Sequence, residues 1–110
     1  MATLLNSTPR LYAAPMISKD QPVAAITGAG GGIGTATALE LARAGYRLAL
    51  SDVDESSLSD LAAALCAHGF EVTTRSVNVG DPTAIEAWAA SVLDDFGRVD
   101  VLVNNAGVTT

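Results

Sequence analysis

The sequence predicts an α/β fold of three layers, αβα, in which helices cover both faces of a parallel sheet. Two observations support this. Short apolar segments alternate with segments whose apolar residues repeat at helical spacing, and the connections between them are short. The resulting order is β-α-β-α-β-α-β, and such alternation gives parallel strands joined by right-handed crossovers. The chain therefore reads as a portion of a doubly wound fold.

The first half of the pattern begins after Gln21. Residues 23–26 form a continuous apolar run, which is typical of a strand buried on both faces. A glycine-rich stretch follows, and residues 33–44 are predicted to be helical, with Gly45 as the stop. Its inward face is predicted to consist of Ile33, Thr37, Leu41 and Ala44. Residues 47–51 form the second predicted strand.

The second half repeats the alternation. Asp54 is a candidate cap for a helix that Gly69 closes, and Asp81 with Pro82 is a typical start for the last helix, which ends at Gly97. Residues 71–77 and 99–104 are the third and fourth predicted strands. The two helices carry apolar stripes at Leu58, Leu61, Ala62 and Leu65, and at Ile85, Trp88, Ala89, Val92 and Phe96. Trp88 and Phe96 are interpreted as core residues rather than as ligand-stacking rings.

Composition excludes several classes of protein. The chain has 110 residues, with six basic and twelve acidic side chains and a net charge of −6, so no nucleic-acid partner is expected. Hydrophobic residues make up 49% and charged residues 16%, which argues against disorder. The mean hydropathy of +0.34 is high for a small domain, so this single domain is expected to be part of a larger fold.

The first 21 residues differ from the rest and are expected to be a flexible leader before a domain at residues 22–110. They lack the compact apolar stretch of a secretory signal, and no run in the chain is long enough to span a membrane. A cytoplasmic location is expected; organelle targeting by residues 1–18, which contain no acid, is the alternative. The lone Cys66 is interpreted as a small hydrophobe on a helix, because Cys66 and His68 make a poor metal site.

Residues 27–34, TGAGGGIG, join the first strand to the first helix, with Gly28, Gly32 and Gly34 spaced G-x-x-x-G-x-G. Glycines let a backbone approach a pyrophosphate closely, and the helix N-terminus offers free N–H groups to an anion. The sequence therefore predicts a phosphate-binding loop, with a purely structural turn as the alternative.

Asp52 ends the second predicted strand, eighteen residues after Gly34. In a dinucleotide-binding fold this position faces the adenosine ribose, and a carboxylate there accepts hydrogen bonds from the ribose hydroxyls. A solvated loop charge is the alternative for Asp52. Asp54 is the competing acid, and the role of a helix cap suits it better.

Three motifs together resemble the classical short-chain dehydrogenase/reductase family over residues 22–110. They are the glycine loop, the segment NVGD at residues 78–81 and the segment NNAG at residues 104–107. The resemblance implies the nucleotide-binding half of a Rossmann-type, NAD(P)-dependent oxidoreductase that transfers hydride between the cofactor and an alcohol or ketone. It also implies that the complete protein is a homo-oligomer.

The resemblance assigns cofactor contacts residue by residue. The glycine loop would line the pyrophosphate and the nicotinamide side, Asp52 would hold the adenosine ribose, and Asn104 would brace the central strands. Asn78 departs from the aspartate that is commonest in the family at this place, although an amide both donates and accepts. The implied cofactor-binding residues are Gly28, Gly31, Gly32, Ile33, Gly34, Asp52, Asn78, Val79, Asn105, Ala106 and Gly107.

NAD is the predicted cofactor in preference to NADP. Asp52 and Asp54 place negative charge where a 2′-phosphate would lie, and residues 51–57 contain no Arg or Lys. Arg75, near the end of the third strand, is the basic residue that would oppose this prediction if its side chain reached the pocket.

No catalytic residue is predicted within the chain. The family uses a Tyr-x-x-x-Lys pair, but Met16 lies four residues after Tyr12 and Leu50 four after Tyr46. We therefore expect a partial sequence of a dehydrogenase, inactive alone. The alternatives are a truncated nucleotide-binding or interaction module, and a different nucleotide-binding α/β protein of the epimerase or flavodoxin type.

Overall fold

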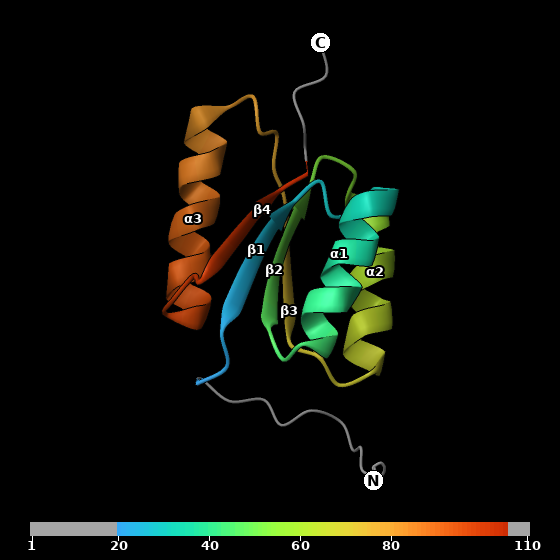
Figure 1. The fold of residues 1–110 in the computed structure, drawn as a ribbon. Coiled ribbons are helices and arrows are strands. Elements are labelled where there is room, and N and C mark those ends of the chain that lie inside the picture. The colour runs from blue at the N-terminus through green and yellow to red at the C-terminus, as the bar shows by residue number, and fades with distance from the viewer. Residues whose placement is uncertain (1–19, 106–110) are drawn as a thin grey trace, which may run out of the picture.

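The computed structural model describes residues 20–105 and has the predicted order of elements (Figure 1). Its four strands are all parallel and lie in the order β3-β2-β1-β4. The α/β fold predicted from the sequence is thereby confirmed. The elements are β1 (Val23–Thr27), α1 (Gly32–Arg43), β2 (Arg47–Asp52), α2 (Glu55–Ala67), β3 (Val72–Ser76), α3 (Pro82–Phe96) and β4 (Val101–Asn104).

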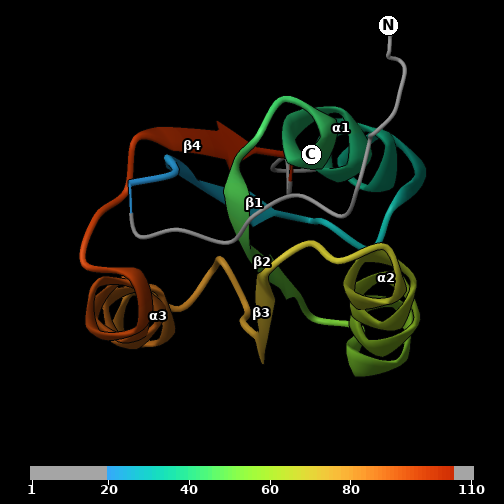
Figure 2. The same ribbon diagram turned by 90° about the horizontal axis from the view of Figure 1, so that it is seen from below.

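Helices α1 and α2 cover one face of the sheet and α3 covers the other (Figures 1 and 2). Successive residues of a strand point to opposite faces, so β1 supplies both cores. Ala24 and Ile26 pack with α1 and α2, whereas Val23 and Ala25 pack with Trp88 and its neighbours on α3. Strand β1 is buried along its whole length, as its continuous apolar run predicted.

The face of α1 that packs on the sheet differs from the predicted one. Ile33 is 76% exposed and Ala44 is also exposed, whereas the buried residues are Gly34, Ala38 and Ala42. These three are spaced four apart, and their small side chains let the helix lie close to β1 and β2. Of the predicted face, Leu41 is half-buried and packs against the core and Thr37 is half-buried. The prediction followed Ile33 and Leu41 and so missed the face built from the smallest residues.

The other two stripes agree better with the structure. Leu58 and Leu65 of α2 are buried, as are Trp88, Val92 and Phe96 of α3, so the core reading of both rings is confirmed. Two predictions were wrong: Ala89 is exposed, and Cys66, although on α2, is exposed rather than packed. Ala89 borders an open cavity between α3 and β4, and Cys66 borders an open groove between α1 and α2, so neither is enclosed by the core.

The predicted helix boundaries rest on observed cap bonds. The Asp54 side chain accepts the N–H groups of Ser56 and Ser57, and the Asp81 side chain accepts those of Thr83 and Ala84. Gly97 ends α3 with a left-handed φ of 77°, a conformation that glycine adopts without strain. Strands β3 and β4 are shorter than predicted: β3 spans Val72–Ser76, and β4 begins at Val101.

The amino ends of the strands carry a cluster of charged groups far from the glycine loop. Asp100 accepts the backbone N–H of Val23 at 2.8 Å and forms an ion pair with Arg98 at 2.7 Å. Arg47 is buried, donates to the carbonyl of Gln21 and lies 5.1 Å from the ring centre of Phe96. Arg47 is therefore remote from the predicted phosphate site.

Two negative findings concern residues 20–105. No helix in this range is both long and apolar enough to cross a membrane. Within the same range, no group of three or more His, Cys, Asp or Glu residues is placed to hold a metal ion.

Candidate functional site

The glycine loop runs from the end of β1 to the start of α1. Gly28 has a left-handed φ of 64°, and a Cβ at Gly34 would clash with the carbonyl oxygen of Gly28. The hydroxyl of Thr35 donates to the Ala29 carbonyl at 3.0 Å, which ties the loop to the first turn of α1. Gly28 and Gly34 are therefore required by the tight turn itself.

The space in front of α1 is open. Gly32 is the first residue of the helix, and a Cβ there would meet nothing within 4 Å. The first turn holds no acidic residue, so no side chain of this turn competes for the positive end of the helix dipole. The N–H groups at this end suit an anion such as a phosphate.

Asp52 lies directly against this loop. It is half-buried at the end of β2; its Oδ2 accepts the N–H of Gly30 at 2.9 Å and its Oδ1 accepts the N–H of Asp54 at 3.0 Å. Each carboxylate oxygen offers about two acceptor positions. Both oxygens of the fixed carboxylate thus retain capacity for the hydroxyls of a ribose.

Sequence reasoning missed Gly30 and Ser57. A Cβ at Gly30 would lie 2.6 Å from the Ser57 Cβ and 3.1 Å from the Asp52 Oδ2, so the first turn of α2 packs against the glycine loop. The run of three glycines at residues 30–32 was the available signal for Gly30. Nothing in the sequence pattern indicated which residue of α2 would reach it.

The remaining predicted residues follow the ends of β3 and β4. Asn78 and Val79 are exposed, and the Asn78 side chain accepts the N–H of Gly80 at 2.9 Å. The Asn104 side chain accepts the Thr27 hydroxyl at 2.8 Å, which is the brace between central strands predicted for Asn104. The side-chain nitrogen of Asn105 is buried and finds no hydrogen-bond partner among residues 20–105. Ala106 and Gly107 lie outside the described residues.

The topology brings these segments to one edge. Residues 28–31, 52, 78 and 105 lie at or just after the carboxyl ends of parallel strands. The chain runs from β1 to β2 and β3 on one side of β1, then crosses back through α3 to β4 on its other side. Open α/β sheets bind ligands outside the carboxyl ends of the strands, at such a switch point. The predicted residues within the described range therefore lie together at the edge of the sheet where folds of this kind bind ligands.

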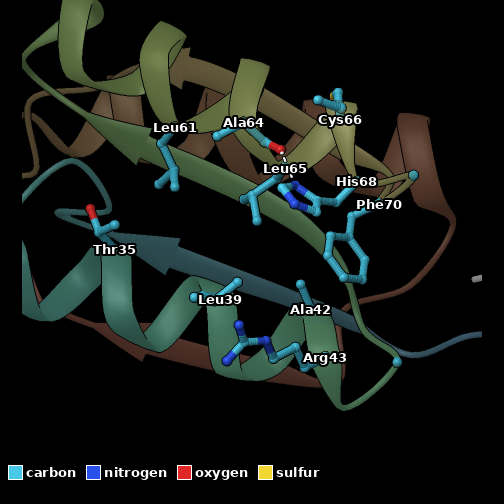
Figure 3. Close-up of a pocket in the computed structure, with 13 residues that line it drawn as sticks. Thr35, Leu39, Ala42, Arg43, Leu61, Ala64, Leu65, Cys66, His68 and Phe70 are labelled. Carbon is cyan, nitrogen blue, oxygen red and sulfur yellow. Dashed lines mark hydrogen bonds between the residues drawn. The ribbon is translucent and has the colours of Figure 1, made fainter. Parts of the chain in front are cut away.

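Two cavities lie outside this edge or at its margin. A groove of about 970 Å³ lies between α1 and α2 and is lined by Leu39, Leu61 and Phe70 among others, none of them a predicted site residue (Figure 3). A second cavity of about 530 Å³ lies between α3 and β4. It is mostly apolar, and Val79 and Asn104 border it.

The chain is similar to known oxidoreductases. It is 43% identical over 83 residues to the probable oxidoreductase EphD of Mycobacterium tuberculosis, covering 76% of this chain and 14% of that protein. It is 41% identical over 88 residues to the 3-oxoacyl-[acyl-carrier-protein] reductase of Synechocystis sp., covering 79% of this chain and 36% of the reductase.

Solved structures share the fold. A crystal structure of actinorhodin polyketide ketoreductase with NADPH matches 84% of this chain and 35% of that chain, with a TM-score of 0.80 and 39% identity. A short-chain dehydrogenase/reductase from Burkholderia phymatum in complex with NAD matches 79% of this chain and 31% of that chain, with a TM-score of 0.74 and 40% identity.

The chain spans about a third of the Synechocystis reductase and a smaller share of EphD. The sequence model of the short chain dehydrogenase family matches residues 22–110, which include the glycine loop, Asp52 and both later motifs. By this match over most of its length, the chain belongs to the short-chain dehydrogenase family.

Proposed function

We propose that the chain is the dinucleotide-binding part of an oxidoreductase that transfers hydride between a nicotinamide cofactor and an alcohol or ketone. One observation carries the proposal: the glycine loop opens onto the N-terminus of α1, with the Asp52 carboxylate fixed beside it. This pairs an anion site with a ribose acceptor at the carboxyl edge of the sheet. The cofactor, once bound, supplies the hydride chemistry; the residues of this chain bind and orient it.

Each segment has a proposed role. The backbone N–H groups of Gly32 and Ile33 hold the pyrophosphate at the start of α1, and Gly31, whose own N–H donates to the Gly28 carbonyl at 3.3 Å, lines it. Asp52 accepts hydrogen bonds from the hydroxyls of the adenosine ribose, and Asn78 and Val79 border the adenine. Three residues after β4 approach the nicotinamide ribose, namely Asn105, Ala106 and Gly107.

NAD is the proposed cofactor in preference to NADP. A phosphate charge about 4 Å from the Asp52 carboxylate would be unfavourable by about 4 kcal/mol at an effective dielectric constant of 20, and by less with solvent screening. No Arg or Lys lies within residues 51–57 to offset it. Arg75 pairs with Ser51 in the register of β3 against β2 and is exposed, so it is the nearest basic candidate by position in the sheet.

The test compares kcat/KM for NAD and NADP in the whole protein, expressed from its complete coding sequence, and in its Asp52→Ala variant. We expect the variant to lose about tenfold or more with NAD, because the ribose loses its charged acceptor, and to gain relative efficiency with NADP. A wild-type protein that prefers NADP would contradict the role of Asp52.

The 110-residue chain alone is proposed to be inactive, since it contains no Tyr-x-x-x-Lys sequence. This observation also favours the second candidate, an inactive nucleotide-binding or interaction module. Sequencing the coding region after Thr110 separates the two: an in-frame Tyr-x-x-x-Lys supports the enzyme, and an immediate stop codon supports the module. The proposed homo-oligomer and the cytoplasmic location rest on the family resemblance and on the leader sequence, respectively.

A further inference from the structure

The groove between α1 and α2 leaves apolar surface uncovered among residues 20–105. It has a volume of about 970 Å³, and the facing sides of the two helices line it (Figure 3). Leu39 of α1, Leu61 of α2 and Phe70 border it and are only half-buried, although all three pack against the core. A contiguous exposed apolar surface of this kind ordinarily marks a contact site.

The described part of the chain begins at one end of this groove. The side chain of Gln21 donates to the carbonyl of Gly45 at 3.0 Å, and Gly45 lines the groove. Thr35, in the first turn of α1, lines the other end, where its hydroxyl donates to the Ala29 carbonyl of the glycine loop. Residues 1–19 therefore join the fold where the groove ends.

Residues 11–17 have the length and the composition to fill the groove. They read LYAAPMI and contain no charged side chain, and only Ser18 and Lys19 separate them from Asp20. Seven residues in an extended conformation span about 23 Å. The 12 residues of α1 are about 18 Å long, so one extended segment is long enough to lie along the whole helix.

The charges of the two parts are complementary. All twelve acidic side chains of the chain lie at or after Asp20, where only four basic side chains accompany them. Residues 1–19 contain Arg10 and Lys19 and no acid. The C-terminal ends of α1 and α2 lie at the Gly45 end of the groove, and a helix C-terminus favours a nearby cation such as Lys19.

We propose that residues 11–17 of this chain dock in the groove between α1 and α2, so that the N-terminal segment covers these helices instead of forming the flexible leader expected from the sequence. The uncharged segment places no cation against Arg43, which also lines the groove. Because the segment is tethered at Gln21, its docking is intramolecular, with an effective concentration on the order of millimolar, which favours it over a separate chain. The docked segment holds α1 against α2 and so supports the glycine loop, which Thr35 ties to α1.

A pair of neighbouring alanines on α2 allows a matched test. Ala64 and Ala63 are both exposed, but only Ala64 lines the groove. In a Cys66→Ala background, Ala64→Cys and Ala63→Cys are each prepared in the whole protein, expressed from its complete coding sequence, with and without residues 2–18. Mass spectrometry measures the alkylation rate of each introduced thiol, and circular dichroism checks folding.

We expect the deletion to raise the alkylation rate at position 64 about fivefold or more, and at position 63 by less than about twofold, because only a thiol in the groove must wait for the docked segment to open. In the undeleted Ala64→Cys protein, Leu11→Ser combined with Tyr12→Ser should raise the rate as the deletion does. Ser7→Ala combined with Thr8→Ala, the control outside the docked stretch, should leave it unchanged.

Two results would overturn the proposal. The first is an equal rate at position 64 with and without residues 2–18, which would mean that the groove is open or that another part of the protein covers it. The second is protection at position 64 that disappears on dilution of the protein, which would assign the groove to a second copy of the chain.

Discussion

At the scale of single residues, the glycines of the loop answer to different constraints. Gly28 and Gly34 meet within the protein, because a side chain at Gly34 would clash with the Gly28 carbonyl. Gly32 faces open space at the start of α1, so a side chain there would meet only a bound ligand. Substitutions at Gly34 and at Gly32 should therefore have separable effects, on stability and on ligand affinity respectively.

We expect Gly34→Ala to lower the free energy of unfolding by about 1–3 kcal/mol, because the added methyl group overpacks the turn; urea denaturation measures this loss.

We expect Gly32→Val to weaken dinucleotide affinity at least tenfold in the whole protein, with a smaller loss of stability than in Gly34→Ala; fluorescence titration measures the affinity. Unchanged affinity in Gly32→Val would refute the phosphate role of the loop, and unchanged stability in Gly34→Ala would refute the packing argument.

The same scale shows where sequence reasoning ends. Asp52 was identifiable because it ends a strand at a fixed distance from the glycine motif, and the structure places it against the loop. The contact of Gly30 with Ser57 was not identifiable, because it depends on how α2 packs against a loop that lies far from it in the sequence. Local pattern predicts which residues end an element but not which neighbour they touch.

At the scale of elements, α1 packs through its smallest residues. Ala38 is fully buried in the middle of the helix, whereas Ala36, two residues earlier, is exposed. Hydrophobic periodicity predicted the helix correctly but centred its inward face on Ile33 and Leu41, because periodicity weighs hydrophobicity and not the room available. A face of Gly and Ala is recognised only once the distance between helix and sheet is known.

The packing of α1 predicts opposite outcomes for one chemical change at two positions. Ala38→Leu should destabilise the protein by about 1–3 kcal/mol, because the added atoms have no space beside β1 and β2. Ala36→Leu, the control on the solvent side, should change stability by less than about 0.5 kcal/mol. Urea denaturation of both variants measures the difference, and equal losses would show that Ala38 does not set the distance between helix and sheet.

The turn between α3 and β4 predicts a dependence of stability on pH. Bonds from Arg98 and then from the Val23 N–H hold the pKa of Asp100 below its ordinary value of 3.8. A lowered folded-state pKa stabilises the fold fully above the unfolded-state pKa, and this contribution is lost as the pH falls through the folded-state pKa. Stability should therefore decline below about pH 4.

We expect Asp100→Asn to be less stable than wild type at pH 7 and to lose less stability between pH 5 and pH 2.5. Thermal unfolding at each pH measures both differences. Asp95→Asn, which removes an equal charge from the exposed side of α3, is the control and should follow the wild-type curve. A curve for Asp100→Asn as steep as that of wild type would assign the acid sensitivity to other carboxylates.

At the scale of the whole molecule, the order of elements and their parallel pairing followed from hydrophobic alternation alone, because buried parallel strands and amphipathic helices have distinct periods. The free edge of the sheet is a property of the assembled fold. Strand β4 pairs with β1 on one side, and among the described residues no strand pairs with its other side. Leu102 on this edge is 65% exposed, and Leu93 of α3 and Val99 are exposed nearby.

This edge predicts the behaviour of the 110-residue chain expressed by itself. Unpaired backbone groups beside exposed leucines favour pairing between copies, so we expect association in sedimentation and a weak near-ultraviolet circular dichroism signal from Trp88. Leu102→Lys, which places a charge on the edge, should shift the chain toward the monomer, whereas Leu39→Lys in the groove between α1 and α2 should not. A monodisperse wild-type monomer with a sharp thermal transition would contradict the prediction and would favour an independent nucleotide-binding module.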